Sequence, residues 1–363
     1  MPTNLGKQLA GWLPQDPQQR RMLRFAIGTT LAMAFAAVSG MPVGYLIPVL
    51  TVSLLGNSQP CLDVSSGLKI IVLIAGSALF GLLFSAATLR YPLPCMLLVI
   101  LLLFRIFYSA AKGAPAIVSA MLLIAITMVP VVALTHQALA LMVAGGLATA
   151  GLFAVFFLWL SHTLVPDLGT DAPAAQAPKP DPISEADATR SALISTSVVA
   201  PAVVLFYYWG ITSHLLTLVF ICLLALNPNL QKSGKGALAL LLANFSGGLV
   251  ALLLFQLLVA MPELTALIIF VFATALLFSQ RLFSDRPTAP LYATAFSTVL
   301  LLIGSTTGDF GGDADEKFYA RIIGIGLAAV YVIFGFVVVA IFSPKAREHI
   351  ATPKSQTANN ADA

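Results

Sequence analysis

Charged residues are scarce in this sequence: Asp, Glu, Lys and Arg together make up 9% of its 363 residues. A water-soluble globular domain usually carries about a quarter charged residues, so the composition excludes that class. Apolar residues make up 59% and the mean hydropathy is +0.94, which is enough for roughly ten to twelve spans of about 20 residues. The sequence therefore predicts an all-α polytopic membrane protein.

Cysteines and catalytic motifs are equally scarce. Cys61, Cys95 and Cys222 have no CxxC or CxxH spacing, which excludes a disulfide framework and a cysteine-based metal site. The GxSxG, Walker A and HExxH motifs are absent, and no GxGxxG stands in context. The four histidines lie in separate segments with no carboxylate near them in sequence, whereas hydrolysis needs an activated nucleophile and a base. We therefore expect no enzyme, no metal and no cofactor.

Acidic residues avoid the centres of the apolar stretches, where proton-coupled pumps commonly carry a carboxylate. Glu263 and His136, near the predicted outer face, are the remaining candidates for proton coupling. Glu263 follows Pro262 directly, so it is also explained as a first-turn acid that favours the helix dipole.

Twelve apolar stretches are separated by proline, glycine or charge, which punctuate helices. They lie at 25–40, 43–57, 70–88, 92–108, 115–134, 139–163, 192–209, 213–227, 236–260, 263–280, 288–304 and 319–342. The first pair has only 33 positions for two spans, so those helices must be short, tilted or broken.

The basic residues favour twelve spans with both termini in the cytoplasm. In that arrangement only Arg90, Lys317 and Arg321 of the 19 Lys and Arg residues fall outside. If 25–57 and 192–227 were single spans, 12 basic residues would lie inside and 7 outside, which fits the positive-inside rule less well. The net charge of +4 is therefore explained by topology, and no nucleic-acid partner is expected.

The two halves of the chain resemble each other. Residues 44–55 align with 213–224, each block ends in a polar turn containing proline (Pro60, Pro228), and a lysine opens the following helix. Repeats of six spans have an even number of crossings, so they are predicted to be parallel. The predicted parts are a cytoplasmic segment (1–23), a first repeat (24–165), a Pro/Ala-rich acidic linker (166–190), a second repeat (191–343) and a disordered cytoplasmic tail (344–363).

Four arginines lie within or at the ends of apolar runs. They are Arg24, Arg105, Arg281 and Arg321. Guanidinium groups around a lumen would attract an anionic substrate, and Arg105 and Arg281 recur at matched places in the repeats. The alternative is that each arginine extends to lipid phosphates as a topology anchor.

Polar residues inside the spans form a second set of candidates for the substrate path. They are Thr29 and Thr30 on the first helix, Ser195, Thr196 and Ser197 on its repeat counterpart, and Asn244. A buried asparagine must find a partner, so bonding between helices is the main alternative to substrate contact. Small residues four positions apart, such as Ser77 with Gly81 and Gly247 with Ala251, predict close helix packing.

This pattern resembles the FUSC-like superfamily of fusaric acid resistance proteins and aromatic carboxylic acid exporters. The resemblance rests on Arg20-Arg21-Met22-Leu23-Arg24 before the first span, the Met41-Pro42 hairpin and the Pro60 and Pro228 turns. It covers residues 20–343 and is strongest for a compact branch whose function is not described. Classical members carry large cytosolic helical regions, which this chain lacks.

The resemblance implies a multi-pass efflux transporter of the bacterial inner membrane for aromatic or other hydrophobic organic anions. Such exporters pair with a periplasmic HlyD-like membrane-fusion protein and an outer-membrane channel, besides contacting membrane lipid. Plant anion channels of the same superfamily use six-helix units as dimers around an arginine-lined path. The resemblance therefore implies that this chain could also form a homo-oligomer. The alternatives are a passive anion channel of the same fold and a non-transporting membrane scaffold for a fusion protein.

Overall fold

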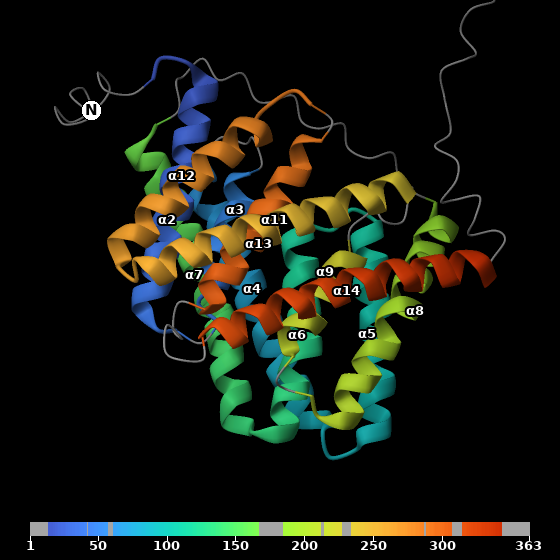
Figure 1. The fold of residues 1–363 in the computed structure, drawn as a ribbon. Helices are drawn as coiled ribbons and strands as arrows, with labels where there is room; N and C mark the ends of the chain where they lie inside the picture. The colour runs from blue at the N-terminus through green and yellow to red at the C-terminus, as the bar shows by residue number, and fades with distance from the viewer. Residues whose placement is uncertain are drawn as a thin grey trace, which may run out of the picture. The chain divides into compact units, whose positions relative to one another are not determined.

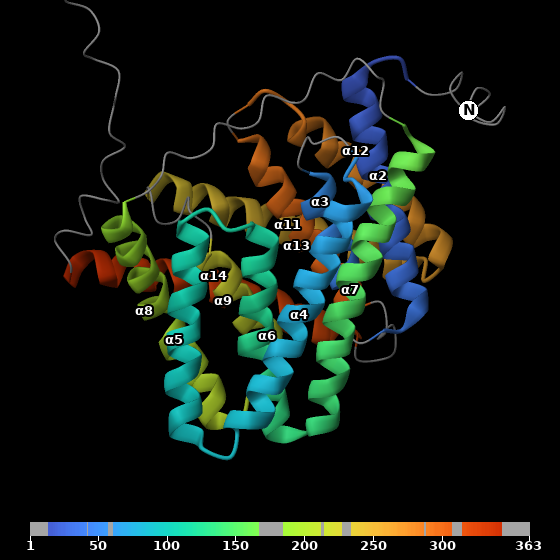
Figure 2. The same cartoon turned by 180° about the vertical axis from the view of Figure 1, so that it is seen from behind.

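A computed structural model describes residues 14–41, 43–56, 61–166, 184–211, 214–226, 234–286, 288–306 and 314–342. Every regular element in these ranges is an α-helix (Figures 1 and 2). The prediction of an all-α polytopic membrane protein is confirmed. The N-terminal residues 1–13, most of the predicted linker (167–183) and the tail from 343 lie outside the described ranges.

Each of the twelve predicted apolar stretches corresponds to one described helix. The helices are α2 (Pro17–Ser39), α3 (Leu46–Leu55), α4 (Val64–Thr88), α5 (Pro92–Ala111), α6 (Ala116–Thr135), α7 (Gln137–Leu164), α8 (Glu185–Trp209), α9 (Leu215–Ala225), α11 (Gly234–Ala260), α12 (Leu264–Leu282), α13 (Ala289–Thr306) and α14 (Ala314–Phe342).

Ten of these helices are long and apolar enough to cross a membrane, and α3 and α9 are not. With 10 and 11 residues, α3 and α9 extend about 15–17 Å, or half of a hydrocarbon core of about 30 Å. They are the second helix of the first and second half of the chain. The first pair was predicted to be short, tilted or broken; α3 is short, and so is α9 in the second half, so ten of the twelve predicted spans are long enough to cross a membrane.

The helix that precedes each short helix begins and ends alike in both halves. Asp16 caps α2 by accepting from the N–H of Gln18, and Ser184 caps α8 by accepting from that of Asp187. Both helices end at a glycine in the left-handed conformation, Gly40 (φ 58°) and Gly210 (φ 59°). Because Ser184 supplies this cap, α8 begins before the predicted end of the linker at residue 190.

The chain divides into two compact units whose boundaries cut through the long helices α4, α7, α11 and α14. Unit 1 comprises 1–79, 141–181 and 243–320; unit 2 comprises 80–140, 182–242 and 321–363. Each unit therefore takes helices from both halves of the sequence.

In unit 1, α2 packs against α3 and α12, and α13 packs against α3 and α12. An aromatic cluster fills the junction: the ring of Phe25 lies 5.8 Å from that of Phe283 and 5.6 Å from that of Phe296. Gln18 closes the same end by donating to the carbonyl of Phe283 over 2.7 Å.

In unit 2, α5 packs against α8 and α6, and α9 packs against α6 and α8. Figure 2 shows α5 and α6 side by side. At one end the Cys95 thiol lies 2.9 Å from the hydroxyl of Tyr207, and exposed Tyr208 and Trp209 follow in α8. Aromatic side chains of this kind gather at membrane interfaces. The 20 residues of α5 extend about 30 Å from this end, which matches the hydrocarbon core.

The packing in the two units follows one scheme. By position in each half, α2, α3, α12 and α13 of unit 1 correspond to α8, α9, α5 and α6 of unit 2, and equivalent pairs are in contact. Glycines allow close approach at equivalent places: a Cβ on Gly81 would lie 2.7 Å from the Ala125 carbonyl oxygen, and one on Gly247 would lie 2.3 Å from that of Ala295. The predicted close packing at small residues is confirmed at both glycines.

Candidate functional site

The predicted site residues are divided between the units. Arg24, Thr29, Thr30, Asn244, Glu263 and Arg281 lie in unit 1, whereas Arg105, His136, Ser195, Thr196, Ser197 and Arg321 lie in unit 2. The side chain of Arg321 is outside the described part of the structure.

Arg24 is buried and binds the end of another helix. Its side chain is 5% exposed, and its Nε donates to the carbonyl of Val165 over 3.0 Å, just past the end of α7. Arg20, which was not among the predicted site residues, donates to the next carbonyl, that of Pro166, over 3.2 Å. Cations at a helix C-terminus satisfy its last carbonyls and favour its dipole. The start of α2 and the end of α7 thus meet.

Arg105 and Arg281 each lie at the end of a row of exposed side chains. The side chains within each row are spaced four residues apart along one helix. The rows are Leu93, Leu97, Leu101 and Arg105 in α5, and Ile269, Ala273, Leu277 and Arg281 in α12. A bilayer covers such apolar rows, and an arginine at the end of one extends its guanidinium to the headgroups. This placement favours the anchor interpretation, and the path role of the two arginines stays a prediction.

Two neighbouring threonines in the middle of α2 differ in how their hydroxyls are satisfied. Thr29 is fully buried and donates to the carbonyl of Phe25 over 2.7 Å, the usual arrangement within a helix. Thr30 is 5% exposed, and its Oγ1 is buried with no hydrogen-bond partner in the described structure. The same helix turn therefore holds one satisfied and one unsatisfied hydroxyl.

The same contrast recurs in α8. Ser195 is fully buried and donates to the carbonyl of Ala225, the last residue of α9, over 3.1 Å. Thr196 is 7% exposed, and its Oγ1 is again buried and unpartnered within the described ranges. Ser197 is exposed and donates to the carbonyl of Ile194. In both halves, the unsatisfied hydroxyl lies on the helix that leads into a short helix.

Asn244 forms a hydrogen bond between two helices, which was the predicted alternative to substrate contact. Thr298 of α13 donates to Oδ1 of Asn244 in α11 over 2.8 Å, and both side chains are buried. The contact lies close to the approach of Gly247 to Ala295 in the same pair of helices.

We expect Asn244→Leu and Thr298→Val to be coupled in their effect on stability. Hydrogen bonds between helices in membranes contribute about 0.6 kcal/mol on average and up to about 1.7 kcal/mol. A double-mutant cycle, measured as the free energy of unfolding in detergent, should return a coupling in this range. Additive losses would show that the bond contributes nothing, and Ser246→Ala, whose hydroxyl bonds within its own helix, serves as the control.

The two candidates for proton coupling lie at helix ends. Glu263 is the exposed N-cap residue of α12 and makes no side-chain cap bond, and His136 is the exposed residue that follows α6. Neither lies within a span, and their role in proton coupling stays a prediction.

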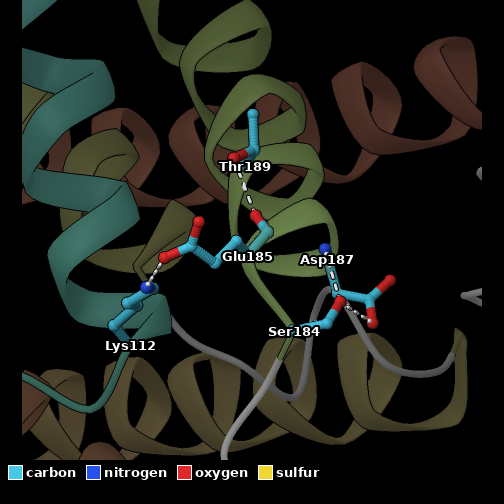
Figure 3. A network of polar contacts seen from close by, with 5 residues as sticks. All are labelled: Lys112, Ser184, Glu185, Asp187 and Thr189. Carbon is cyan, nitrogen blue, oxygen red and sulfur yellow. Dashed lines mark hydrogen bonds and ion pairs between the residues drawn. The ribbon is translucent and has the colours of Figure 1, made fainter.

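A polar network at the start of α8 was not foreseen from the sequence (Figure 3). The Nζ of Lys112, which follows α5, lies 2.8 Å from Oε1 of Glu185. The hydrogen bond to Glu185 raises the pKa of Lys112 above that of a free lysine, so this lysine stays charged at neutral pH and the ion pair is lost only at alkaline pH. Glu185 at the start of α8 and Gln18 at the start of α2 hold similar places in their units. Each makes a polar contact with the residue that follows the corresponding helix, Lys112 after α5 and Phe283 after α12.

A second unforeseen contact involves α14. The hydroxyl of Tyr331 donates to the carbonyl of Val198 in α8 over 2.9 Å. No sequence signal points to this contact, because Pro201 deprives the carbonyl of Ser197, and not that of Val198, of its usual donor. Within the described residues no group of three or more His, Cys, Asp or Glu could hold a metal ion.

Comparison with known proteins places only part of the chain. Residues 21–161 match a membrane-protein family described as "Protein of unknown function (DUF2955)". The match extends from α2 almost to the end of α7 and thus covers the first half. No curated protein and no solved structure matches the chain.

Proposed function

We propose that this membrane protein is an efflux transporter for aromatic or other hydrophobic organic anions in the bacterial inner membrane. Each unit would offer a substrate contact of its own: in unit 1 at the middle of α2 beside the short helix α3, and in unit 2 at the middle of α8 beside the short helix α9. Following the superfamily resemblance, a periplasmic HlyD-like membrane-fusion protein and an outer-membrane channel are the proposed partners.

The matched pair of short helices is the observation that carries this proposal. In transporters built from repeats, unusually short hydrophobic segments at corresponding positions of the two halves indicate the binding site. Here α3 and α9 hold corresponding positions and reach about half the thickness of a hydrocarbon core.

The hydroxyl of Thr30 would supply the polar contact in unit 1, and the hydroxyl of Thr196 would supply it in unit 2. Leaving a buried hydroxyl without a partner costs about 1–3 kcal/mol, which a structural role does not repay. A bound carboxylate would accept from such a hydroxyl, and the cost would then be offset when substrate binds. Thr29 and Ser195 are satisfied within the protein and would orient their helices.

The anionic character of the substrate rests on the superfamily resemblance and not on Arg105 or Arg281. These two arginines would concentrate anions near the membrane surface through their charge, without contacting the bound substrate. The proposal therefore does not require either guanidinium to line the path.

Valine substitutions test the proposal because valine keeps the shape of threonine and removes the hydroxyl. We expect the double variant Thr30→Val/Thr196→Val to lose most uptake of radiolabelled benzoate into inside-out membrane vesicles. Its thermal stability should stay the same or rise, since an unsatisfied buried hydroxyl is removed. Thr29→Val is the matched control and should lower stability, because it removes the bond to Phe25.

Unchanged benzoate uptake by the folded double variant would remove the two threonines from the site. Flux that follows the benzoate gradient alone, with currents far above transporter turnover, would favour the passive channel. Absence of any uptake, together with retained binding of a fusion protein, would favour the scaffold.

A further inference from the structure

We propose that unit 2 carries a binding site for the phosphate of an anionic phospholipid, formed by Arg190 of α8 together with Arg105 of α5. The site lies toward the end of the helix pair at which α8 begins, which is the cytoplasmic side in the predicted topology. It is separate from the proposed substrate contacts and does not depend on transport.

The two helices that carry these arginines pack together and run in opposite directions. At one end of the pair, the Cys95 thiol of α5 lies 2.9 Å from the hydroxyl of Tyr207 in α8. At the other end, Lys112 directly after α5 pairs with Glu185, the first residue of α8 (Figure 3). The end of α5 therefore lies beside the start of α8.

Arg105 and Arg190 lie at nearly the same level of this pair. Arg105 stands seven residues before Lys112, which places it about 10 Å from this end along α5. Arg190 stands five residues after Glu185, which places it about 8 Å from the same end along α8. The pair thus presents two guanidinium groups at one depth.

The guanidinium of Arg190 lacks a full set of acceptors. Its Nη2 atom is buried and has no hydrogen-bond partner among the described residues. The nearest acids along the chain are engaged: Asp187 accepts from the hydroxyl of Ser184 over 2.8 Å, and Glu185 pairs with Lys112. A guanidinium stays charged at any physiological pH, and a partly buried charge without a counter-charge is destabilising. Because this nitrogen makes no bond that would have to be broken, the side chain can turn to meet an anion.

Exposed apolar faces lead to both arginines. In α5, the exposed row that ends at Arg105 consists of Leu93, Leu97 and Leu101. In α8, the exposed row that begins one turn after Arg190 consists of Leu193, Ser197, Pro201 and Leu205. Acyl chains cover such rows, and a phosphate accepts from guanidinium groups in a planar, two-pronged geometry. Anionic lipids also attract basic residues that lie beside a span. The arrangement therefore fits a lipid phosphate with its tails along the helix pair.

The corresponding arginine of unit 1 is bound by the protein itself. Arg24 corresponds to Arg190, because each stands five residues before the bonded hydroxyl of its helix, Thr29 or Ser195. Arg24 is buried and donates to a carbonyl just past the end of α7. In unit 1 this leaves Arg281 of α12, the counterpart of Arg105, exposed without Arg24 as a second free guanidinium. Arg281 is therefore the matched control.

The experiment titrates the purified full-length protein in dodecyl maltoside with dioleoylphosphatidylglycerol and follows thermal unfolding. This anionic lipid should raise the unfolding midpoint more than zwitterionic dioleoylphosphatidylcholine does. We expect Arg190→Gln to weaken the apparent affinity for phosphatidylglycerol at least tenfold, the change that a hydrogen bond to a charged group supports. Arg105→Gln should weaken it about fivefold, the contribution of one basic residue near a membrane surface, and Arg281→Gln should leave it unchanged.

A second measurement does not depend on unfolding. Native mass spectrometry of the lipid-treated protein counts the phosphatidylglycerol molecules that stay bound, and Arg190→Gln should retain fewer than Arg281→Gln. Glycerol 1-phosphate, which has no acyl chains, should not stabilise the protein at the concentrations at which the lipid does.

Three results would overturn the proposal. Equal losses in Arg190→Gln and Arg281→Gln would show that binding follows overall charge. Unchanged affinity in Arg190→Gln would remove this arginine from any lipid site. Stabilisation by glycerol 1-phosphate equal to that by phosphatidylglycerol would identify a site for a free phosphate. None of these results bears on benzoate uptake, so they leave the proposed function to its own test.

Discussion

Replacing Gly247 with alanine is expected to destabilise the protein by about 1–3 kcal/mol, the usual cost of overpacking a close contact. The added Cβ would lie 2.3 Å from the carbonyl oxygen of Ala295 and 3.0 Å from its carbonyl carbon. Backbone atoms cannot turn aside as a flexible side chain can, so α11 and α13 must separate. Separation would also lengthen the nearby bond between Thr298 and Asn244.

Gly248 is the matched control for Gly247. It belongs to the same helix, and a Cβ there meets nothing within 4 Å. Gly248→Ala should be neutral or stabilise the protein by up to about 1 kcal/mol, because alanine favours a helix over glycine. Thermal unfolding of the two purified variants in detergent measures the difference, and equal midpoints would contradict the close approach of α11 to α13.

Arg24→Met is expected to cost about 1.5–3 kcal/mol, the contribution of a hydrogen bond to a charged group. Methionine keeps much of the apolar stem but leaves the Val165 carbonyl without its donor, and Val165 is only 1% exposed. Arg24→Lys should fall between wild type and Arg24→Met, because a lysine keeps the charge and loses the planar geometry of the guanidinium.

Arg105→Met provides the comparison, because it removes the same charge from the cytoplasmic side of the predicted topology. Arg105 ends an uncovered apolar row, so its replacement should change stability by no more than about 0.5 kcal/mol. The free energy of unfolding of the two variants, measured under the same detergent conditions, gives the contrast. Similar values would mean that burial of Arg24 does not matter for stability.

The helices could be predicted from the sequence because hydropathy is a local property. Each apolar stretch became one helix, and the crowding of residues 25–57 already required a short element. Capping was local as well: Ser184, with an acid three residues later, marks the start of α8. α8 therefore begins within the stretch that was predicted as linker up to residue 190.

The pairing of helices could not be predicted, because an apolar face does not identify its partner. Arg24 illustrates the difficulty: its partner is a backbone carbonyl 141 residues away, which has no side-chain signature. The bond from Tyr331 to the carbonyl of Val198 could not be foreseen for the same reason. The repeated threonines were predicted as polar candidates, but only coordinates could separate bonded Thr29 from unbonded Thr30.

The interleaving of the two halves has a consequence for biogenesis. α2 and α3 leave the ribosome early, yet their packing partners α12 and α13 are made more than 200 residues later. Neither half can complete a compact body by itself, so the newly inserted first half must wait in the bilayer with its contact faces unfilled. Final assembly then depends on the end of synthesis, when the last helices enter both bodies.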